Sequence, residues 1–256
     1  MKILHSLIQG KGPDLLNLHG FLGMLDNWKT IGNRLAEDGF RVHLIDQRNH
    51  GNSFQSTEFN YRVMAEDLLQ YAHHHGLEKF ILLGHSMGGK TAMQFAFAHP
   101  DKVAKLIVAD IAPKEYPPHH SQILRALSTL PLDELQSRAD ADRHLARFIP
   151  EAGVRQFLLK NLYRKPDQHF GLKCHIEVLA KSEEAIGEHF KTDATYTGPV
   201  LFLKGALSGY ITTEDELSIH RYFPAAQIQT VSQAGHWLHA ENPDEFYQYL
   251  LAFAKI

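Results

Sequence analysis

The sequence predicts an α/β fold with a mostly parallel central sheet flanked by helices, and three observations support this. Short apolar runs of strand length alternate with stretches of helical length, so successive strands need crossover connections and lie parallel. Apolar residues make up 44% and charged residues 21% of the 256 residues, which is enough for a full buried core. A chain of this length corresponds to one large domain or to a domain that carries an insertion.

The elements of the core follow one another in a regular order. An antiparallel edge strand is expected within residues 2–8. The parallel strands are expected at residues 15–18, 40–45, 80–83, 103–109, 199–204 and 226–231. The core helices are expected at residues 26–37, 61–74, 87–98, 214–222 and 244–255. Glycine or a His-Pro pair follows each of the first three helices, as is typical where helices end.

The alternation stops between residues 112 and 198. Prolines interrupt the start of this stretch, and no convincing strand occurs within it. Helices are expected there at residues 121–130, 139–148, 154–164 and 172–190. An insertion of about 85 residues is long enough to be a subdomain rather than a loop. We therefore expect a core of residues 1–111 and 199–256 that carries an all-helical cap of residues 112–198.

Composition and charge argue against several classes of protein. The formal net charge of −3 argues against a nucleic-acid partner held by phosphate contacts. A single cysteine, Cys174, can form neither an intrachain disulfide nor a cysteine-based zinc site. No apolar run approaches the ~18–20 residues that span a bilayer, and residues 1–10 lack the apolar run of a signal peptide. We expect a cytoplasmic protein with no metal and no membrane insertion.

A Gly-x-Ser-x-Gly motif at residues 84–88 carries the chemistry. It follows the expected strand at residues 80–83, and a helix begins at once, which is the context in which this motif holds a nucleophile. Glycines without a Cβ let the strand and the helix approach closely around Ser86. We expect Ser86 to be the nucleophile. The alternative is an ordinary glycine-rich turn with an idle serine.

A serine hydroxyl needs a base to take its proton and an acid to orient that base. Loops at the carboxyl ends of parallel strands converge on one crevice, so the base should follow the last strand. His236 lies just after the strand at residues 226–231, and we expect it to be the base. His239, which lies closer to the last helix, is the competitor.

Asp110 is the preferred acid. It closes a buried strand at the same edge as Ser86, and a carboxylate that ends an apolar run is costly unless it is paired or catalytic. Its alternative role is to cap the turn into the insertion. Glu214 and Asp215 are the competing acids, although both stand where a helix begins and acidic caps are common.

Acyl transfer also needs hydrogen-bond donors for the oxyanion. We expect these to be the backbone N–H groups of Met87, directly after the nucleophile, and of Phe21, in the loop after the first parallel strand. For Phe21 the alternative is packing on the core. The segment at residues 46–53 is interpreted as structural, either as a hydrogen-bonded turn between Asp46 and Arg48 or as packing beneath the nucleophile loop.

Two motif blocks carry a family resemblance. Residues 44–53 read LIDQRNHGNS, residues 83–93 read LGHSMGGKTAM, and together they resemble the YbfF-type bacterial esterases of the α/β-hydrolase superfamily, an abhydrolase-domain family. The resemblance covers nearly the whole chain. It implies an α/β-hydrolase fold, a helical cap over the active site, and Asp110 as the acid. Ser208 departs from the wider pattern, because it stands in the loop where most of the superfamily carries its acid.

The resemblance further implies a serine esterase that hydrolyses carboxylic ester or thioester bonds of small-molecule acyl substrates, and short acyl, long acyl and acyl-CoA substrates all fit it. Ser86, His236 and Asp110 would form the triad, with an acyl-enzyme intermediate and no cofactor. The alternatives are a lyase, a carbon–carbon hydrolase or a haloperoxidase with the same triad, or a non-catalytic binding protein. The residues expected to line the substrate site are Tyr116, Phe148, Phe157, Tyr163 and Trp237.

Overall fold

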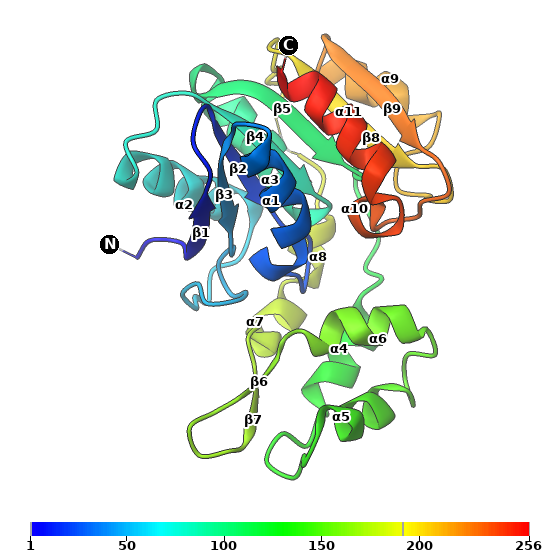
Figure 1. Ribbon diagram of the computed structural model, residues 1–256. Helices are drawn as coiled ribbons and strands as arrows, with labels where there is room; N and C mark the ends of the chain where they lie inside the picture. The colour runs from blue at the N-terminus through cyan, green and yellow to red at the C-terminus, as the bar shows by residue number, and fades with distance from the viewer. Residues whose placement is uncertain (1, 191, 256) are drawn as a thin grey trace.

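The computed structural model describes residues 2–190 and 192–255, in which one mixed sheet of seven strands is flanked by helices (Figure 1). Residues 1, 191 and 256 fall within the expected domain bounds but lie outside the described residues. The spatial order of the strands is β1-β3-β2-β4-β5-β8-β9. Their bounds are β1 (Ser6–Gln9), β2 (Asp14–Leu18), β3 (Arg41–Ile45), β4 (Phe80–His85), β5 (Val103–Ala109), β8 (Val200–Gly205) and β9 (Ala226–Val231). Strand β1 is antiparallel to β3 and the other pairs are parallel, which confirms the predicted α/β fold.

The core helices lie close to their predicted positions. They are η1 (Leu25–Trp28), α1 (Lys29–Glu37), α2 (Tyr61–His74), α3 (Met87–Ala98), η2 (Pro100–Lys102), α9 (Asp215–Tyr222), α10 (Leu238–Glu241) and α11 (Pro243–Lys255). Asn60 caps the start of α2, and its side chain accepts a hydrogen bond from the Val63 N–H at 3.0 Å. Within the described chain, no helix combines the length and the apolar character needed to cross a bilayer.

Both faces of the sheet are covered. Side chains along a strand alternate between the faces, so Leu16 and Leu82 pack in the cluster that includes α2 and α3, while Leu15 and Leu83 pack in the cluster that includes α1 and α11. Each large aliphatic side chain buried in this way contributes about 1.5–3 kcal/mol. Functional groups therefore reach a substrate only from the loops at the ends of the strands.

The strand register brings several of these loops together. The chain leaves β2 towards β3 on one side and leaves β4 towards β5 on the other, so the crevice expected of such a sheet opens between β2 and β4. Leu18, at the end of β2, pairs with Gly84 of β4. His85 of β4 pairs with Ala109 of β5. The residues that follow this last pair, Ser86 and Asp110, consequently start neighbouring loops at the same edge.

The insertion at residues 112–198 joins β5 to β8, and it is not all-helical. Its helices are α4 (Ser121–Ser128), α5 (Arg138–Leu145), α6 (Ala152–Leu159), α7 (Ile176–Lys181) and α8 (Glu183–Gly187). Strands β6 (Leu162–Arg164) and β7 (Phe170–Leu172) form a hairpin, so the expectation of no strand there is wrong. The turn between them contains Pro166 and has Gln168 at a φ of 72°, which reverses the chain and ends the helix expected at residues 154–164 early.

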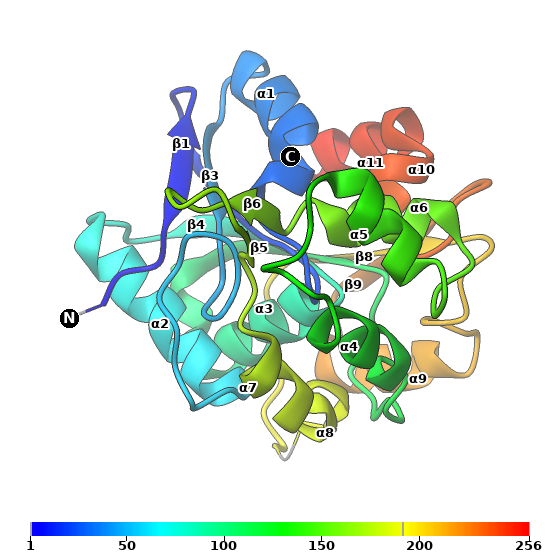
Figure 2. The ribbon, with the colours of Figure 1, turned by 90° about the horizontal axis from the view of Figure 1, so that it is seen from below.

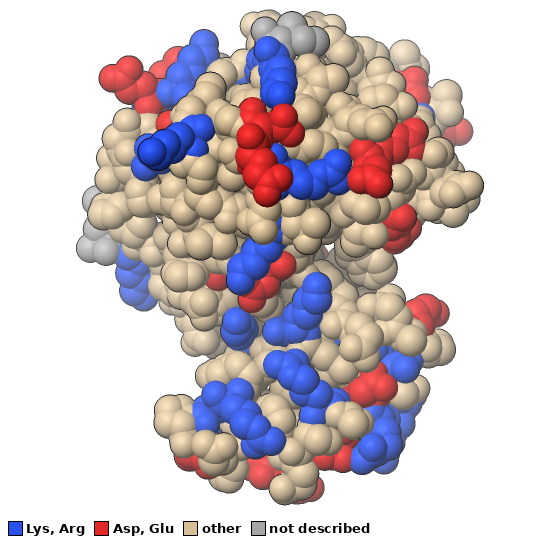
Figure 3. All heavy atoms as spheres, in the orientation of Figure 1, with Lys and Arg blue, Asp and Glu red and all other residues tan. Residues whose placement is uncertain are grey.

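The insertion packs against the loops at the carboxyl ends of the parallel strands. Figure 2 shows α4, α5 and α6 in front of the sheet, and Figure 3 shows a narrower waist between the two parts of the molecule. A third apolar cluster joins insertion residues such as Leu127 and Leu158 to Phe21 and Met87 of the core. The insertion is therefore held by apolar packing next to the loop that contains Ser86.

Candidate active site

Ser86 occupies a strained turn between β4 and α3. Its φ of 53° and ψ of −119° lie in a region that residues with a side chain rarely adopt. The Ser86 N–H donates to the carbonyl of Ala109 at 3.0 Å, which anchors the turn to β5. The serine is 8% exposed and lines two cavities. Strain of this kind is expected where a sharp strand-to-helix turn presents a nucleophile.

Two glycines make this turn sterically feasible. A Cβ on Gly84 would lie 2.2 Å from the carbonyl oxygen of Gly88, and a Cβ on Gly88 would lie 2.3 Å from the carbonyl oxygen of Leu18. Both distances are far too short for non-bonded atoms. The spacing of the glycines in the motif is thus required by the packing of α3 against β4 and β2.

The structure brings Asp110 and His236 into direct contact. Asp110 is completely buried and has a φ of 51°, and its Oδ2 atom lies 2.8 Å from Nδ1 of His236. A carboxylate only accepts hydrogen bonds, so the proton of the neutral imidazole is on Nδ1. The Nε2 atom of His236 is then left as an acceptor, as a base requires. Ser86 and His236 line the same cavity.

Further donors hold the Asp110 carboxylate. Its Oδ1 atom accepts a hydrogen bond from the Gly205 N–H at 3.1 Å, and its Oδ2 atom also accepts one from the hydroxyl of Ser208. Ser208 stands in the loop after β8, where the sequence offered a serine in place of an acid. The serine therefore contacts the carboxylate from β5 instead of replacing it.

The ring of His236 is fixed from two other sides. Tyr210 stacks on it with ring centroids 3.9 Å apart and an angle of 17° between the planes. The backbone carbonyl of His236 accepts a hydrogen bond from Nε2 of His85 at 2.7 Å. Burial lowers the pKa of His85 well below its usual value, so His85 is a neutral donor. These contacts connect the position of His236 to the residue immediately before Ser86.

The competing residues have other partners. Asp215 accepts hydrogen bonds from the Thr212 N–H at 2.8 Å and from Nζ of Lys114 at 2.6 Å, and Glu214 is exposed. His239 stacks on Trp28 with ring centroids 3.9 Å apart. Burial lowers the pKa of His239 to about 3. Asp215 is therefore engaged in capping, and His239 lines the cavity beside Ser86 but is packed on Trp28 and has no contact with Asp110 among the described residues.

The loop after β2 approaches the nucleophile closely. A Cβ on Gly20 would lie 2.8 Å from Nδ1 of His85 and 3.3 Å from Cβ of Ser86, so only glycine fits there. The next residue, Phe21, lines the cavity with Ser86, and its N–H has no acceptor among the described residues. Met87 is the first residue of α3, where N–H groups lack intrahelical partners and the helix dipole favours negative charge. Both N–H groups are thus available beside Ser86.

The cavity beside Ser86 is small and shares part of its wall with a wider groove. It has a volume of about 60 Å³, and Phe157 and Trp237 are among its walls. The same two residues line an outer groove of about 510 Å³ between α6 and α10, and their ring centroids are 5.5 Å apart. Tyr116 lines a second cavity on the other side of Ser86, with a volume of about 20 Å³. Three of the five expected lining residues therefore lie at these spaces.

The other two expected lining residues lie elsewhere. Neither Phe148 nor Tyr163 lines the two cavities that contact Ser86. Phe148 packs against the apolar cluster of the insertion, where its ring centroid is 5.7 Å from that of His144. Tyr163 is 39% exposed on strand β6 and covers Gly171 of β7. The hairpin, which the sequence did not predict, turns Tyr163 outwards.

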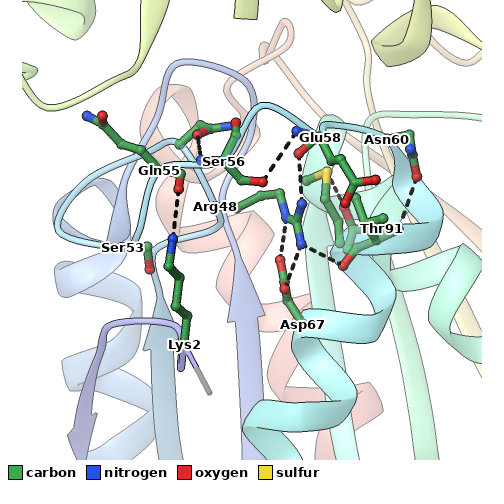
Figure 4. A network of polar contacts seen from close by, with 12 residues as sticks. Lys2, Arg48, Ser53, Gln55, Ser56, Glu58, Asn60, Asp67 and Thr91 are labelled. Atoms are coloured by element: carbon green, nitrogen blue, oxygen red, sulfur yellow. Dashed lines mark hydrogen bonds and ion pairs between the residues drawn. The ribbon is translucent and has the colours of Figure 1, made fainter. Parts of the chain in front are cut away.

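The loop at residues 46–53 is a rigid scaffold, with one difference from expectation. Arg48 does not pair with Asp46 but with Asp67 on α2, through contacts of 2.5 and 2.8 Å (Figure 4). Asp46 instead accepts hydrogen bonds from the N–H groups of Leu25 and Asn52. The structural interpretation fits these contacts, but the arginine joins the loop to a helix rather than closing a turn.

The sequence reasoning missed His120, which lies at the site, and Lys90, a buried lysine behind it. His120, from the start of α4, lines both cavities that contain Ser86, and burial lowers its pKa to about 3. Lys90 on α3 is 1% exposed and donates to the carbonyls of Gly187 and Glu188 at 3.1 and 2.5 Å. No sequence pattern marked Lys90 as buried, and the location of His120 depends on how the insertion folds. No group of three or more His, Cys, Asp or Glu side chains in residues 2–190 and 192–255 could hold a metal ion.

Comparisons with known proteins agree with this architecture. Residues 13–149 match the family model described as alpha/beta hydrolase fold. The chain is 36% identical over 262 residues to an sn-1-specific diacylglycerol lipase of Mus musculus, covering 99% of this chain and 85% of the relative. It is 32% identical over 237 residues to esterase YbfF of Escherichia coli, covering 92% and 91%. A solved marine microorganism esterase superposes with a TM-score of 0.96 at 43% identity, covering 99% of this chain and all of that one.

Proposed function

Because the chain belongs to the α/β-hydrolase fold family and is a hydrolase related to esterases and lipases, we propose that it is a serine esterase with Ser86, His236 and Asp110 as its triad. The observation that carries this proposal is the contact of 2.8 Å between Asp110 Oδ2 and His236 Nδ1, at a cavity that Ser86 also lines. The contact leaves the other imidazole nitrogen free to act as a base.

In the first step, Oγ of Ser86 attacks the carbonyl carbon of the ester while Nε2 of His236 takes the hydroxyl proton. Asp110 stays ionised and stabilises the imidazolium that forms. The bond from the carbonyl carbon to the leaving oxygen then breaks, and His236 gives its proton to that oxygen. The products of this step are the alcohol and an acyl group on Ser86.

The carbonyl oxygen gains negative charge in the tetrahedral intermediate. The free N–H groups of Phe21 and Met87 are the proposed donors to this oxygen. Such donors act where charge develops, so they stabilise the transition state more than the bound ester. In the second step a water molecule, deprotonated by His236, attacks the acyl carbon; the bond from that carbon to Oγ breaks, His236 returns the proton to Oγ of Ser86, and the acid is released.

The proposed substrate is an uncharged acyl ester whose chain points towards the insertion, which acts as a cap. The cavity of about 60 Å³ beside Ser86 fits a short acyl group. A longer chain would pass Phe157 and Trp237 into the outer groove of about 510 Å³. The mouse relative is named a diacylglycerol lipase, which supports a substrate with an alkyl chain. A thioester with the same acyl group would fit the same chemistry.

Labelling with a fluorophosphonate probe tests this function directly. The probe phosphonylates an activated serine, and mass spectrometry of the digested protein locates the adduct. We expect one adduct, on Ser86, and none in Ser86→Ala. Ser137→Ala is the matched control, because Ser137 caps α5 and should not affect labelling. Absence of an adduct on Ser86 in the folded wild-type protein would overturn the proposal.

A further inference from the structure

The loop that carries Phe21 contains a second strained residue. The N–H of Gly23 donates to the carbonyl of Gly20 at 3.0 Å, which closes a four-residue turn, and Leu22 at the third position has a φ of 58°. A positive φ at this position is typical of type II turns, in which glycine is the favoured residue. A leucine there is strained, so the turn must be held by its surroundings.

Both backbone groups of Leu22 have a buried partner. Its N–H donates to Nε2 of His50 at 3.2 Å, and its carbonyl accepts a hydrogen bond from Nδ2 of Asn161 at 2.7 Å. His50 and Asn161 are completely buried. A flip of the Phe21–Leu22 peptide, which separates type I from type II turns, would break the first of these bonds. Loss of the second would leave a buried carbonyl unpaired, which is unfavourable.

The partner on the core side is held by further hydrogen bonds. Nδ1 of His50 lies 2.9 Å from the carbonyl of Arg48, so Nδ1 carries the proton and Nε2 accepts. Burial lowers the pKa of His50 to about 3, which keeps this neutral form throughout the physiological range. Arg48 is in turn bound to Asp67 on α2 (Figure 4). This side of the turn is thus connected through Arg48 to α2.

The partner on the insertion side is connected to the walls of the cavity. Asn161 follows α6, and its own N–H donates to the carbonyl of Leu158 at 3.0 Å. Leu158 and Phe157 of α6 line the cavity beside Ser86. Among the described residues, the side chain of Asn161 forms one hydrogen bond, which is the bond to Leu22. Asn161 therefore links the end of α6 to the turn.

We propose that Asn161 is a positioning residue that holds the strained turn at Leu22 and so orients the Phe21 N–H towards the oxyanion. The proposal rests on the esterase function proposed above. In this arrangement the oxyanion site is complete only while α6 of the insertion packs against the core. An acyl group that contacts Phe157 and Leu158 would stabilise this docked state and, through Asn161, the donor.

The test compares Asn161→Leu with Tyr196→Phe. The hydroxyl of Tyr196 donates to the carbonyl of Val103 at 3.0 Å, so its loss also removes a buried hydrogen bond between the insertion and the core, at the far end of β5. For Asn161→Leu we expect kcat to fall about tenfold to hundredfold with little change in KM, because only a transition-state contact is misplaced. For Tyr196→Phe we expect kcat within about twofold of the wild-type value, although its loss of thermal stability should be similar to that of Asn161→Leu.

A third variant separates positioning from general stability. Leu22→Gly removes the cost of a positive φ, so the turn should persist without Asn161. In that background, Asn161→Leu should lower kcat by less than about threefold. Two outcomes would contradict the positioning role. One is a fall in kcat on Asn161→Leu that is as large in the Leu22→Gly background as in the wild type. The other is a fall in kcat on Asn161→Leu that is no larger than the fall on Tyr196→Phe.

Amide hydrogen exchange gives a readout that does not depend on activity. Asn161→Leu should speed exchange in the peptide that covers residues 18–25, and Tyr196→Phe should not. Faster exchange in a protein without Ser86-dependent hydrolysis would support the contact with the turn and contradict the esterase function. Unchanged exchange in Asn161→Leu, with hydrolysis intact in the wild type, would contradict the positioning role alone.

Discussion

The Nδ1 atom of His236, in the loop after β9, lies 2.8 Å from the Oδ2 atom of Asp110 at the end of β5. The two residues are 126 positions apart in the chain, and the insertion lies between them. Asp110 reaches this place because Ala109 pairs with His85 and with Leu203, which puts the end of β5 between the nucleophile loop and β8. The proposed acid is therefore positioned by the sheet itself.

The first prediction concerns the identity of the acid. Asp110→Asn should lower kcat by about 10⁴-fold, because an amide that donates to Nδ1 favours the wrong tautomer of His236. Asp215→Asn is the matched control, since Asp215 is bonded to Lys114 and Thr212, and it should affect stability rather than kcat. Steady-state kinetics and thermal melting of both variants check this. A loss of kcat in Asp215→Asn alone would assign the acid to the loop after β8.

The second prediction concerns Ser208. Its hydroxyl donates to the same Asp110 oxygen that contacts His236. Ser208→Ala should lower kcat about tenfold, as expected when a hydrogen bond to a charged group worth about 1.5 kcal/mol is lost. Ser232→Ala, which removes a hydroxyl bound to Glu245 at the surface, should leave kcat unchanged. Equal kcat values for the two variants would show that the contact with Ser208 is irrelevant to the reaction.

The third prediction concerns chain length. Phe157→Ala should join the cavity beside Ser86 to the outer groove and shift the optimum to longer acyl chains. The ratio of kcat/KM for a laurate ester to that for a butyrate ester should rise about tenfold, which corresponds to about 1.4 kcal/mol of discrimination. Phe148→Ala, at a position away from both cavities, is the control. A ratio that stays constant in Phe157→Ala would place the acyl chain elsewhere.

The fourth prediction concerns stability against pH. Burial lowers the pKa of His50, His120 and His239 to about 3 and that of His19 to about 4. The unfolded chain binds a proton at each of these sites below about pH 6.5, while the folded protein does not until a much lower pH. The free energy of unfolding should therefore decrease as the pH falls from about 6.5 to about 4. Each site contributes up to about 1.4 kcal/mol per pH unit.

Denaturant unfolding at several pH values checks this. His239→Phe should keep the stack on Trp28 and flatten the dependence of the unfolding free energy on pH. His220→Gln, on the exposed end of α9, is the control and should keep the wild-type slope. A slope in His239→Phe as steep as in the wild type would mean that His239 is protonated in the folded protein.

Much of the core could be predicted from local pattern alone. The apolar runs that become β4 and β5 are bounded by helical stretches, and this alternation determines a parallel sheet with both faces covered. Ser86 could be predicted as the candidate nucleophile because its glycines are spaced for a close strand-to-helix contact. Asp110 could be predicted as the candidate acid because a carboxylate at the end of a buried strand needs a partner.

The insertion could not be predicted to the same depth. The apolar spacing from Val154 to Leu162 fits a helix, but α6 ends at Leu159 because the turn around Pro166 and Gln168 draws residues 162–164 into a hairpin. Pairing with residues further along the chain outweighs the local preference of residues 162–164 for a helix. Helical periodicity gives no information about such pairing.

Contacts between distant segments were also beyond the sequence pattern. The bond of Asn161 to the carbonyl of Leu22 joins residues 139 positions apart, and the partner of Arg48 proved to be Asp67 rather than Asp46. These pairs depend on how the insertion and the loop after β3 pack in three dimensions. No spacing rule connects residues across such separations.

The most direct test of the central claim is the initial rate of hydrolysis of p-nitrophenyl esters from acetate to palmitate, measured in parallel for the wild type and for Ser86→Ala. A serine esterase predicts clear turnover by the wild type and a loss of order 10⁶-fold in kcat in the folded variant. The same turnover in Ser86→Ala, or no turnover of any ester by the folded wild type, would contradict the claim that Ser86 is the nucleophile of an esterase.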